Sequence, residues 1–105
     1  MKKTSFPKQD IKVLLLEGVA RTAVETFRAA GYSNIEFHEK SLPEAELAAA
    51  VATAHIVGIR SRSQLTPEIF QNSRRLMAVG AFCIGTNQIA LDAAQARGIP
   101  VFNAP

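Results

Sequence analysis

Short apolar runs alternate along the chain with segments whose apolar residues recur at helical spacing. The first run, residues 11–17, is almost continuously aliphatic and stops at Gly18, which is typical of a strand buried on both faces. The next segment has the spacing of an amphipathic helix, with Gly31 as its expected end. The same alternation predicts four more strands, of which the first is more polar and nearer an edge: residues 34–39, 55–60, 76–82 and 100–103.

Three further helices are predicted between these later strands. Ser41 and Glu44 have the S-x-x-E spacing of a capping box, with a proline in the first turn, so a helix is expected from there to residue 53. Thr66 is the expected N-cap of the next helix, because a proline follows it at the first helical position. The last helix is predicted over about residues 89–97.

Strict alternation of strand and helix with short connections predicts a parallel sheet wrapped by helices through right-handed crossovers. For five strands we predict an α/β fold of the flavodoxin-like kind, with strand order 2-1-3-4-5 and helices on both faces. A single half of a nucleotide-binding fold is the alternative.

Length and composition favour one globular domain. The chain has 105 residues, and we expect a polar leader over residues 1–10 and one domain over residues 11–105. The net charge of +3 comes from scattered positive residues, so nucleic acid is not a predicted partner. The lone cysteine, Cys83, excludes an intrachain disulfide and favours a reducing, cytoplasmic compartment. No secretory signal is present, and no apolar segment reaches the roughly 18 residues that span a bilayer, so no membrane partner is predicted.

The strongest candidate for chemistry is Arg60-Ser61-Arg62, directly after an apolar run. In the predicted fold this is the carboxyl end of the third strand, next to Gly18 at the point where the strand order reverses and ligands bind. Guanidinium groups bind carboxylate or phosphate oxygens two at a time. The segment therefore predicts a pocket for a small anion, and a solvated charge cluster is the alternative.

Other candidates are weaker. Cys83 has no neighbouring histidine, and a packed thiol is its expected role. His38 and His55 lack metal-ligand spacing, so both are interpreted as structural and no metal is predicted. Glu17 lies at the same predicted edge, but a carboxylate at a strand end is more often solvated. No G-x-G-x-x-G fingerprint occurs, and no catalytic set of residues can be assembled.

Several segments, in order and without gaps, resemble the bacterial D-3-phosphoglycerate dehydrogenases of the D-isomer-specific 2-hydroxyacid dehydrogenase family. These segments are LLEGV at 15–19, RAAGY at 28–32, NIEFH at 34–38, IRSR at 59–62, FCIGTNQ at 82–88, LDAA at 91–94 and RGIPVFNAP at 97–105. The resemblance implies a flavodoxin-like substrate-binding domain in an enzyme of serine biosynthesis that oxidises 3-phosphoglycerate with NAD.

The resemblance also implies roles for individual residues. Arg60, Ser61 and Arg62 would hold the carboxylate and phosphate of a small phosphorylated hydroxy acid, and Ile84 and Gly85 would approach the nicotinamide. Many members of the family carry a lysine at the position of Glu39, whereas here the lysine follows it.

The family's NAD-binding Rossmann domain and catalytic histidine have no counterpart in these 105 residues, so the chain is expected to be catalytically silent by itself. Two alternatives remain open. One is a stand-alone module that binds small anions. The other is an α/β scaffold that associates with itself through apolar surface left uncovered.

Overall fold

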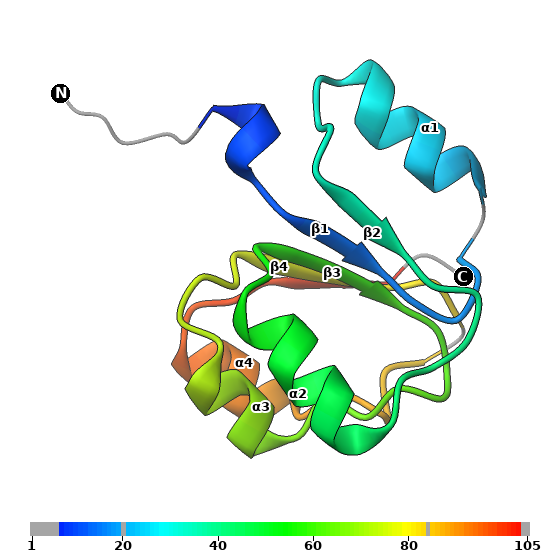
Figure 1. Cartoon of the computed structure of the whole chain (residues 1–105). Helices are drawn as coiled ribbons and strands as arrows, with labels where there is room; N and C mark the ends of the chain where they lie inside the picture. The colour runs from blue at the N-terminus through cyan, green and yellow to red at the C-terminus, as the bar shows by residue number, and fades with distance from the viewer. Residues whose placement is uncertain (1–6, 20, 84, 104–105) are drawn as a thin grey trace, which may run out of the picture.

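A computed structural model describes residues 7–19, 21–83 and 85–103. The described residues form one parallel sheet of five strands in the order β2-β1-β3-β4-β5 (Figure 1). This is the predicted order, and it excludes the single half of a nucleotide-binding fold because β1 lies between β2 and β3. The strands are β1 (Val13–Leu15), β2 (Ile35–Phe37), β3 (Ile56–Ile59), β4 (Ala78–Ala81) and β5 (Val101–Asn103).

Helices cover both faces of the sheet, as predicted. They are α1 (Arg21–Ala29), α2 (Glu44–Ala52), α3 (Pro67–Asn72) and α4 (Leu91–Ala96). Helix α1 lies alone on one face, and α2, α3 and α4 lie together on the other (Figure 1). The split follows from the strand order: the chain moves outward from β1 to β2 and then back past β1 to β3, so right-handed crossovers place α1 and α2 on opposite faces.

Each face of the sheet has its own apolar cluster. The larger cluster lies beneath α2, α3 and α4, where the fully buried Phe70 is the largest side chain. The smaller cluster joins Val13, Leu15 and Val19 to α1, where Phe27 packs edge-on against Tyr32. Because β1 supplies residues to both clusters, its aliphatic run has no polar face, and this explains the nearly continuous apolar pattern.

The sequence predicted how two of the helices begin, and the structure confirms one of these predictions and shows that the other is wrong. Thr66 is the N-cap of α3, and its hydroxyl accepts a hydrogen bond from the backbone N–H of Ile69 at 3.3 Å. The capping box at Ser41 and Glu44 is not formed. Pro43 has an extended backbone and is itself the N-cap, without a side-chain cap, so the helix begins at Glu44. Ser41 therefore lies outside capping reach.

The described part of the predicted leader packs on the domain. Lys8–Asp10 forms a short 3-10 helix, and the Lys8 ammonium donates to the carbonyl of Ala30, just after α1, at 2.8 Å. Of the helices that the structure describes, none is long and apolar enough to cross a membrane.

Part of one face of the sheet is not packed against a helix. Helix α1 packs over β1 and β2, and beside it an apolar groove of about 270 Å³ crosses β3 and β4 to Phe102 on β5. Phe102 is 62% exposed. Uncovered apolar surface is therefore present on this face.

Candidate functional site

An open cleft of about 640 Å³ lies at the carboxyl edge of the sheet. It forms where β1 and β3 are neighbours and the chain leaves them toward opposite faces. Loops after three strands line it, with the residues Glu17, Glu39, Lys40, Ser41, Arg60, Ser61 and Arg62. The cleft thus occupies the position at which open parallel sheets bind ligands.

The loop after β3 brings the three predicted substrate residues together. Arg60, Ser61 and Arg62 are all exposed, and all three line the cleft beside the turn that contains Gly18. Neither guanidinium has a hydrogen-bond or ion-pair partner within the described part of the chain. The geometry therefore leaves two cations free to bind an anion, and that role stays a prediction.

Glu17 holds this loop in place. Its carboxylate accepts the backbone N–H groups of Arg60 at 3.0 Å, Arg62 at 2.7 Å and Ser63 at 2.9 Å. Partial burial raises the pKa of Glu17, but the N–H donors of Arg62, Ser63 and Arg60 outweigh it and hold the pKa below its ordinary value. The carboxylate is therefore a charged anchor for the loop and differs from the solvated strand-end residue that the sequence suggested.

The backbone at Glu17 is unusual for a residue with a side chain. Its φ is 62°, in the left-handed region, and that of Gly18 is 63°. The two residues turn the chain sharply, and their N–H groups donate to the carbonyls of Lys40 and His38 in the loop after β2. This turn joins the loops on the two sides of the cleft.

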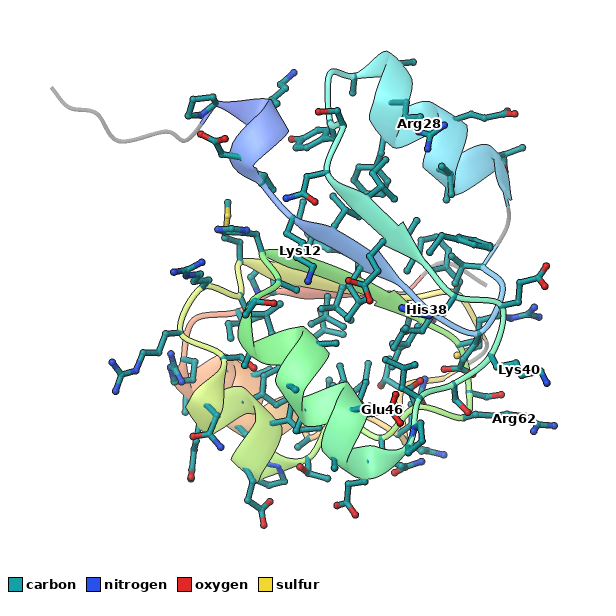
Figure 2. The ribbon with its side chains drawn as sticks, in the orientation of Figure 1. Lys12, Arg28, His38, Lys40, Glu46 and Arg62 are labelled. Carbon is teal, nitrogen blue, oxygen red and sulfur yellow. The ribbon has the colours of Figure 1, made fainter. Side chains whose placement is uncertain are left out.

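Lys40 adds a third cation to the cleft. It lines the cavity with Ser41, and Figure 2 shows Lys40 and Arg62 on the same side of the molecule, both directed outward. Sequence reasoning noted the lysine that follows Glu39 but did not include it among the site residues. A lysine therefore lies in the wall of the cleft at position 40, next to Glu39.

The loop after β4 is bound to the arginine loop. The buried Gln88 side chain donates to the carbonyl of Arg60 at 2.7 Å, and its amide nitrogen lies 3.2 Å from the sulfur of Cys83. The N–H of Leu65 donates to the carbonyl of Gln88 at 2.9 Å. The Cys83 thiol is thus partly buried and has hydrogen-bond partners, which is consistent with the packed thiol that the sequence predicted.

The predicted cofactor residues are only partly described. Ile84 lies outside the described residues. Gly85 is exposed, and a side chain added there would meet no atom within 4 Å. Asn103, at the end of β5, donates to the carbonyls of Ala81 and Cys83 at 3.2 and 2.6 Å and so supports this turn from the neighbouring strand.

Both histidines have structural partners, as predicted. The ring of His38 bonds to the carboxylate of Glu36, which also pairs with Lys12 at 3.1 Å. The Nδ1 atom of His55 accepts the backbone N–H of Lys12 at 3.0 Å. Burial, with a smaller contribution from the charge of Arg75, lowers the pKa of His55. Within residues 7–19, 21–83 and 85–103, no three His, Cys, Asp or Glu side chains are grouped to hold a metal.

Comparison with known proteins gives one family match. Residues 13–105 match the model of the D-isomer specific 2-hydroxyacid dehydrogenase catalytic domain. The whole chain is 53% identical to the D-3-phosphoglycerate dehydrogenase of Escherichia coli strain K12 and covers 26% of it. The enzyme of the same name from Haemophilus influenzae is 52% identical over 98% of the chain, which covers 25% of it. The chain thus spans about a quarter of the length of these relatives.

Solved structures show the same fold. The TT0316 protein of Thermus thermophilus superposes on 87% of the chain with a TM-score of 0.78 and 25% identity, and the chain covers 29% of it. An NAD-bound 3-phosphoglycerate dehydrogenase of Entamoeba histolytica superposes on 91% with a TM-score of 0.77 and 19% identity, and 33% of that protein is covered.

Proposed function

The chain belongs to the catalytic-domain family of the D-isomer-specific 2-hydroxyacid dehydrogenases, and from this we propose that it is the substrate-binding portion of an NAD-dependent D-3-phosphoglycerate dehydrogenase. The reaction converts the hydroxyl carbon of 3-phosphoglycerate to the ketone of 3-phosphohydroxypyruvate. The carbon loses a hydride to NAD and the oxygen loses a proton. This is a step of serine biosynthesis. The observation that carries the proposal is the cleft, whose arginines have no hydrogen-bond or ion-pair partner among the described residues, in a chain 53% identical to the Escherichia coli enzyme.

The cleft supports binding of a small acid with two anionic groups. Arg60 and Arg62 would bind the carboxylate and phosphate, and Ser61 between them supplies a hydroxyl. Lys40 would contribute a third positive charge from the opposite wall. A phosphorylated hydroxy acid carries the charge that such a cleft would neutralise, and an uncharged substrate would leave the cations without partners.

NAD, when bound, supplies the acceptor for the hydride. The exposed Gly85 carries no side chain of its own, and this supports the approach of a flat ring at that position. In the proposal Ile84 contributes to the same approach. In the proposal, the other parts of the NAD site are supplied by a Rossmann domain, as the family resemblance implies.

The chain alone is proposed to bind substrate without turnover. No histidine lines the described cleft, and the catalytic histidine that the resemblance to the family implies has no counterpart in these 105 residues. General acid–base catalysis needs a group free to exchange a proton with the substrate hydroxyl. We therefore expect no NAD reduction by these 105 residues with 3-phosphoglycerate. Parent-like turnover would refute this division of roles.

The binding proposal is tested by titrating the chain with 3-phosphoglycerate and following backbone amide NMR signals. We expect the signals of residues 59–63 to move, and the shifts to disappear in Arg60→Ala and Arg62→Ala. Arg28→Ala is the matched control, because Arg28 lies on α1 and does not line the cleft (Figure 2). If the signals of residues 59–63 do not move, the cleft is not a substrate site. Equal affinity for any small phosphorylated acid would favour a stand-alone anion-binding module.

A second candidate function, self-association, is supported by the apolar groove beside Phe102. Exposed apolar surface favours burial against a second copy. Light scattering at rising concentration should then report a dimer that Phe102→Ser weakens. A monomer at high concentration would contradict it. We further propose a cytoplasmic location, because Cys83 is the only cysteine and suits a reducing compartment.

A further inference from the structure

The two arginines of the cleft lie on a loop whose backbone has few other supports. In the part of the chain that the structure describes, the N–H of Arg62 has Glu17 as its only hydrogen-bond partner, at 2.7 Å. Arg60 is held twice, by Glu17 at its N–H and by Gln88 at its carbonyl. The position of Arg62 therefore depends on Glu17 more than that of Arg60 does.

We infer that Glu17 is a positioning residue, whose carboxylate holds residues 60–63 so that Arg60 and Arg62 face one ligand together. This inference rests on the proposed function, since it concerns the same cleft. Both oxygens of the Glu17 carboxylate already accept backbone N–H groups: one accepts from Arg60 and Ser63, and the other from Arg62. Its effect on binding is therefore exerted through the loop.

Three features show that this contact is built into the fold. The carboxylate binds groups 43 to 46 residues away in sequence, so it joins the end of β1 to the loop after β3. Glu17 has a left-handed backbone, which is unfavourable for a residue with a Cβ and has to be compensated by its contacts. Its N–H also bonds to Lys40 on the other wall. One residue thus connects all three loops of the cleft.

A ligand with two anionic groups depends on this geometry more than a ligand with one. If the loop loosens, either arginine can still bind a single carboxylate, but the two no longer converge. The preference for 3-phosphoglycerate over glycerate, which has the carboxylate and lacks the phosphate, measures this convergence. A contribution to global stability alone would leave the preference unchanged in the folded protein.

The test compares Glu17→Gln with Glu36→Gln in the full 105-residue chain. Glu36 is the matched control, because its carboxylate also has two partners and a lowered pKa but does not line the cleft. We expect Glu17→Gln to weaken 3-phosphoglycerate binding about tenfold, equal to about 1.4 kcal/mol, and glycerate binding far less. Glu36→Gln should keep the ratio of the two affinities within about twofold of the wild type.

Amide hydrogen exchange gives a readout that needs no ligand. Glu17→Gln should speed the exchange of Arg62 and Ser63 more than that of Arg60, whose carbonyl keeps the Gln88 bond. If Glu17→Gln does not fold, Glu17→Asp, which keeps the charge on a shorter side chain, is expected to show the same pattern. An unchanged affinity ratio or unchanged exchange overturns the positioning role alone. Failure of the wild type to bind 3-phosphoglycerate overturns the proposed function as well.

Discussion

Replacing Gly18 by alanine tests the turn that shapes the cleft, and Gly98→Ala is its matched control. Both glycines have a left-handed φ, 63° at Gly18 and 68° at Gly98. A Cβ at Gly18 would lie 3.3 Å from the backbone oxygen of Glu39, whereas one at Gly98 would meet nothing within 4 Å. The two substitutions therefore share the conformational penalty and differ in the contact.

The expected magnitudes follow from these two contributions. The left-handed conformation costs a residue with a Cβ about 1–2 kcal/mol, and the stiffer unfolded chain returns about 0.4–1 kcal/mol. Gly98→Ala should therefore lower the free energy of unfolding by about 1 kcal/mol. Crowding in a packed region costs a further ~1–3 kcal/mol, so the loss at Gly18→Ala should be about 2–4 kcal/mol.

Urea denaturation followed by circular dichroism measures both free energies of unfolding. Gly18→Ala should also weaken 3-phosphoglycerate binding, because Glu39 lines the cleft and the N–H of Gly18 holds the carbonyl of His38. Gly98→Ala should bind as the wild type does. Equal losses of stability in the two variants would refute the crowding at Glu39, and unchanged binding in Gly18→Ala would refute the link between this turn and the cleft.

Three other predictions concern the core, a helix cap and pH. Phe70→Ala, at a fully buried position, should lower the free energy of unfolding by about 3–5 kcal/mol in urea, whereas the exposed Leu91→Ala should cost far less. Thr66→Ala removes the cap of α3 and should cost about 1 kcal/mol, with Thr66→Ser restoring most of it. Burial, and to a smaller extent the charge of Arg75, lowers the pKa of His55 in the folded state. As pH falls, the unfolded state therefore takes up the His55 proton at a higher pH than the folded state does. Stability from His55 is therefore present above its unfolded pKa of about 6.5 and lost as pH falls through its lower folded value. When urea denaturation is measured from pH 7 to pH 5, the free energy of unfolding should fall less in His55→Gln than in the wild type.

Each of these three predictions has a contradicting outcome. A cost below 1 kcal/mol for Phe70→Ala would mean that the cluster beneath α2, α3 and α4 is not tightly packed. Equal stability of Thr66→Ala and the wild type would exclude the cap. If the pH dependence of the free energy of unfolding is the same in His55→Gln and the wild type, another group is responsible for it.

The order of the elements could be predicted because it follows from local pattern. Aliphatic runs stopped by glycine, helical spacing and the Thr66 cap each depend on residues close together in the chain. Strict alternation then restricts the sheet to few arrangements. The position of Arg60 and Arg62 at the carboxyl edge followed from this order alone. Even locally one prediction was wrong, since the backbone at Pro43 is extended and the helix starts after it.

The details of the cleft depend on contacts between residues far apart in the chain. A glutamate before a glycine gives no local sign that it will accept three N–H groups from a loop more than 40 residues later. The same holds for the bond from Gln88 to Arg60 and for the place of Lys40 in the wall. Local chemistry therefore determines which strands and helices form. Only packing of the sheet determines which polar groups meet, because hydrogen bonds of this kind require the strand ends to be side by side first.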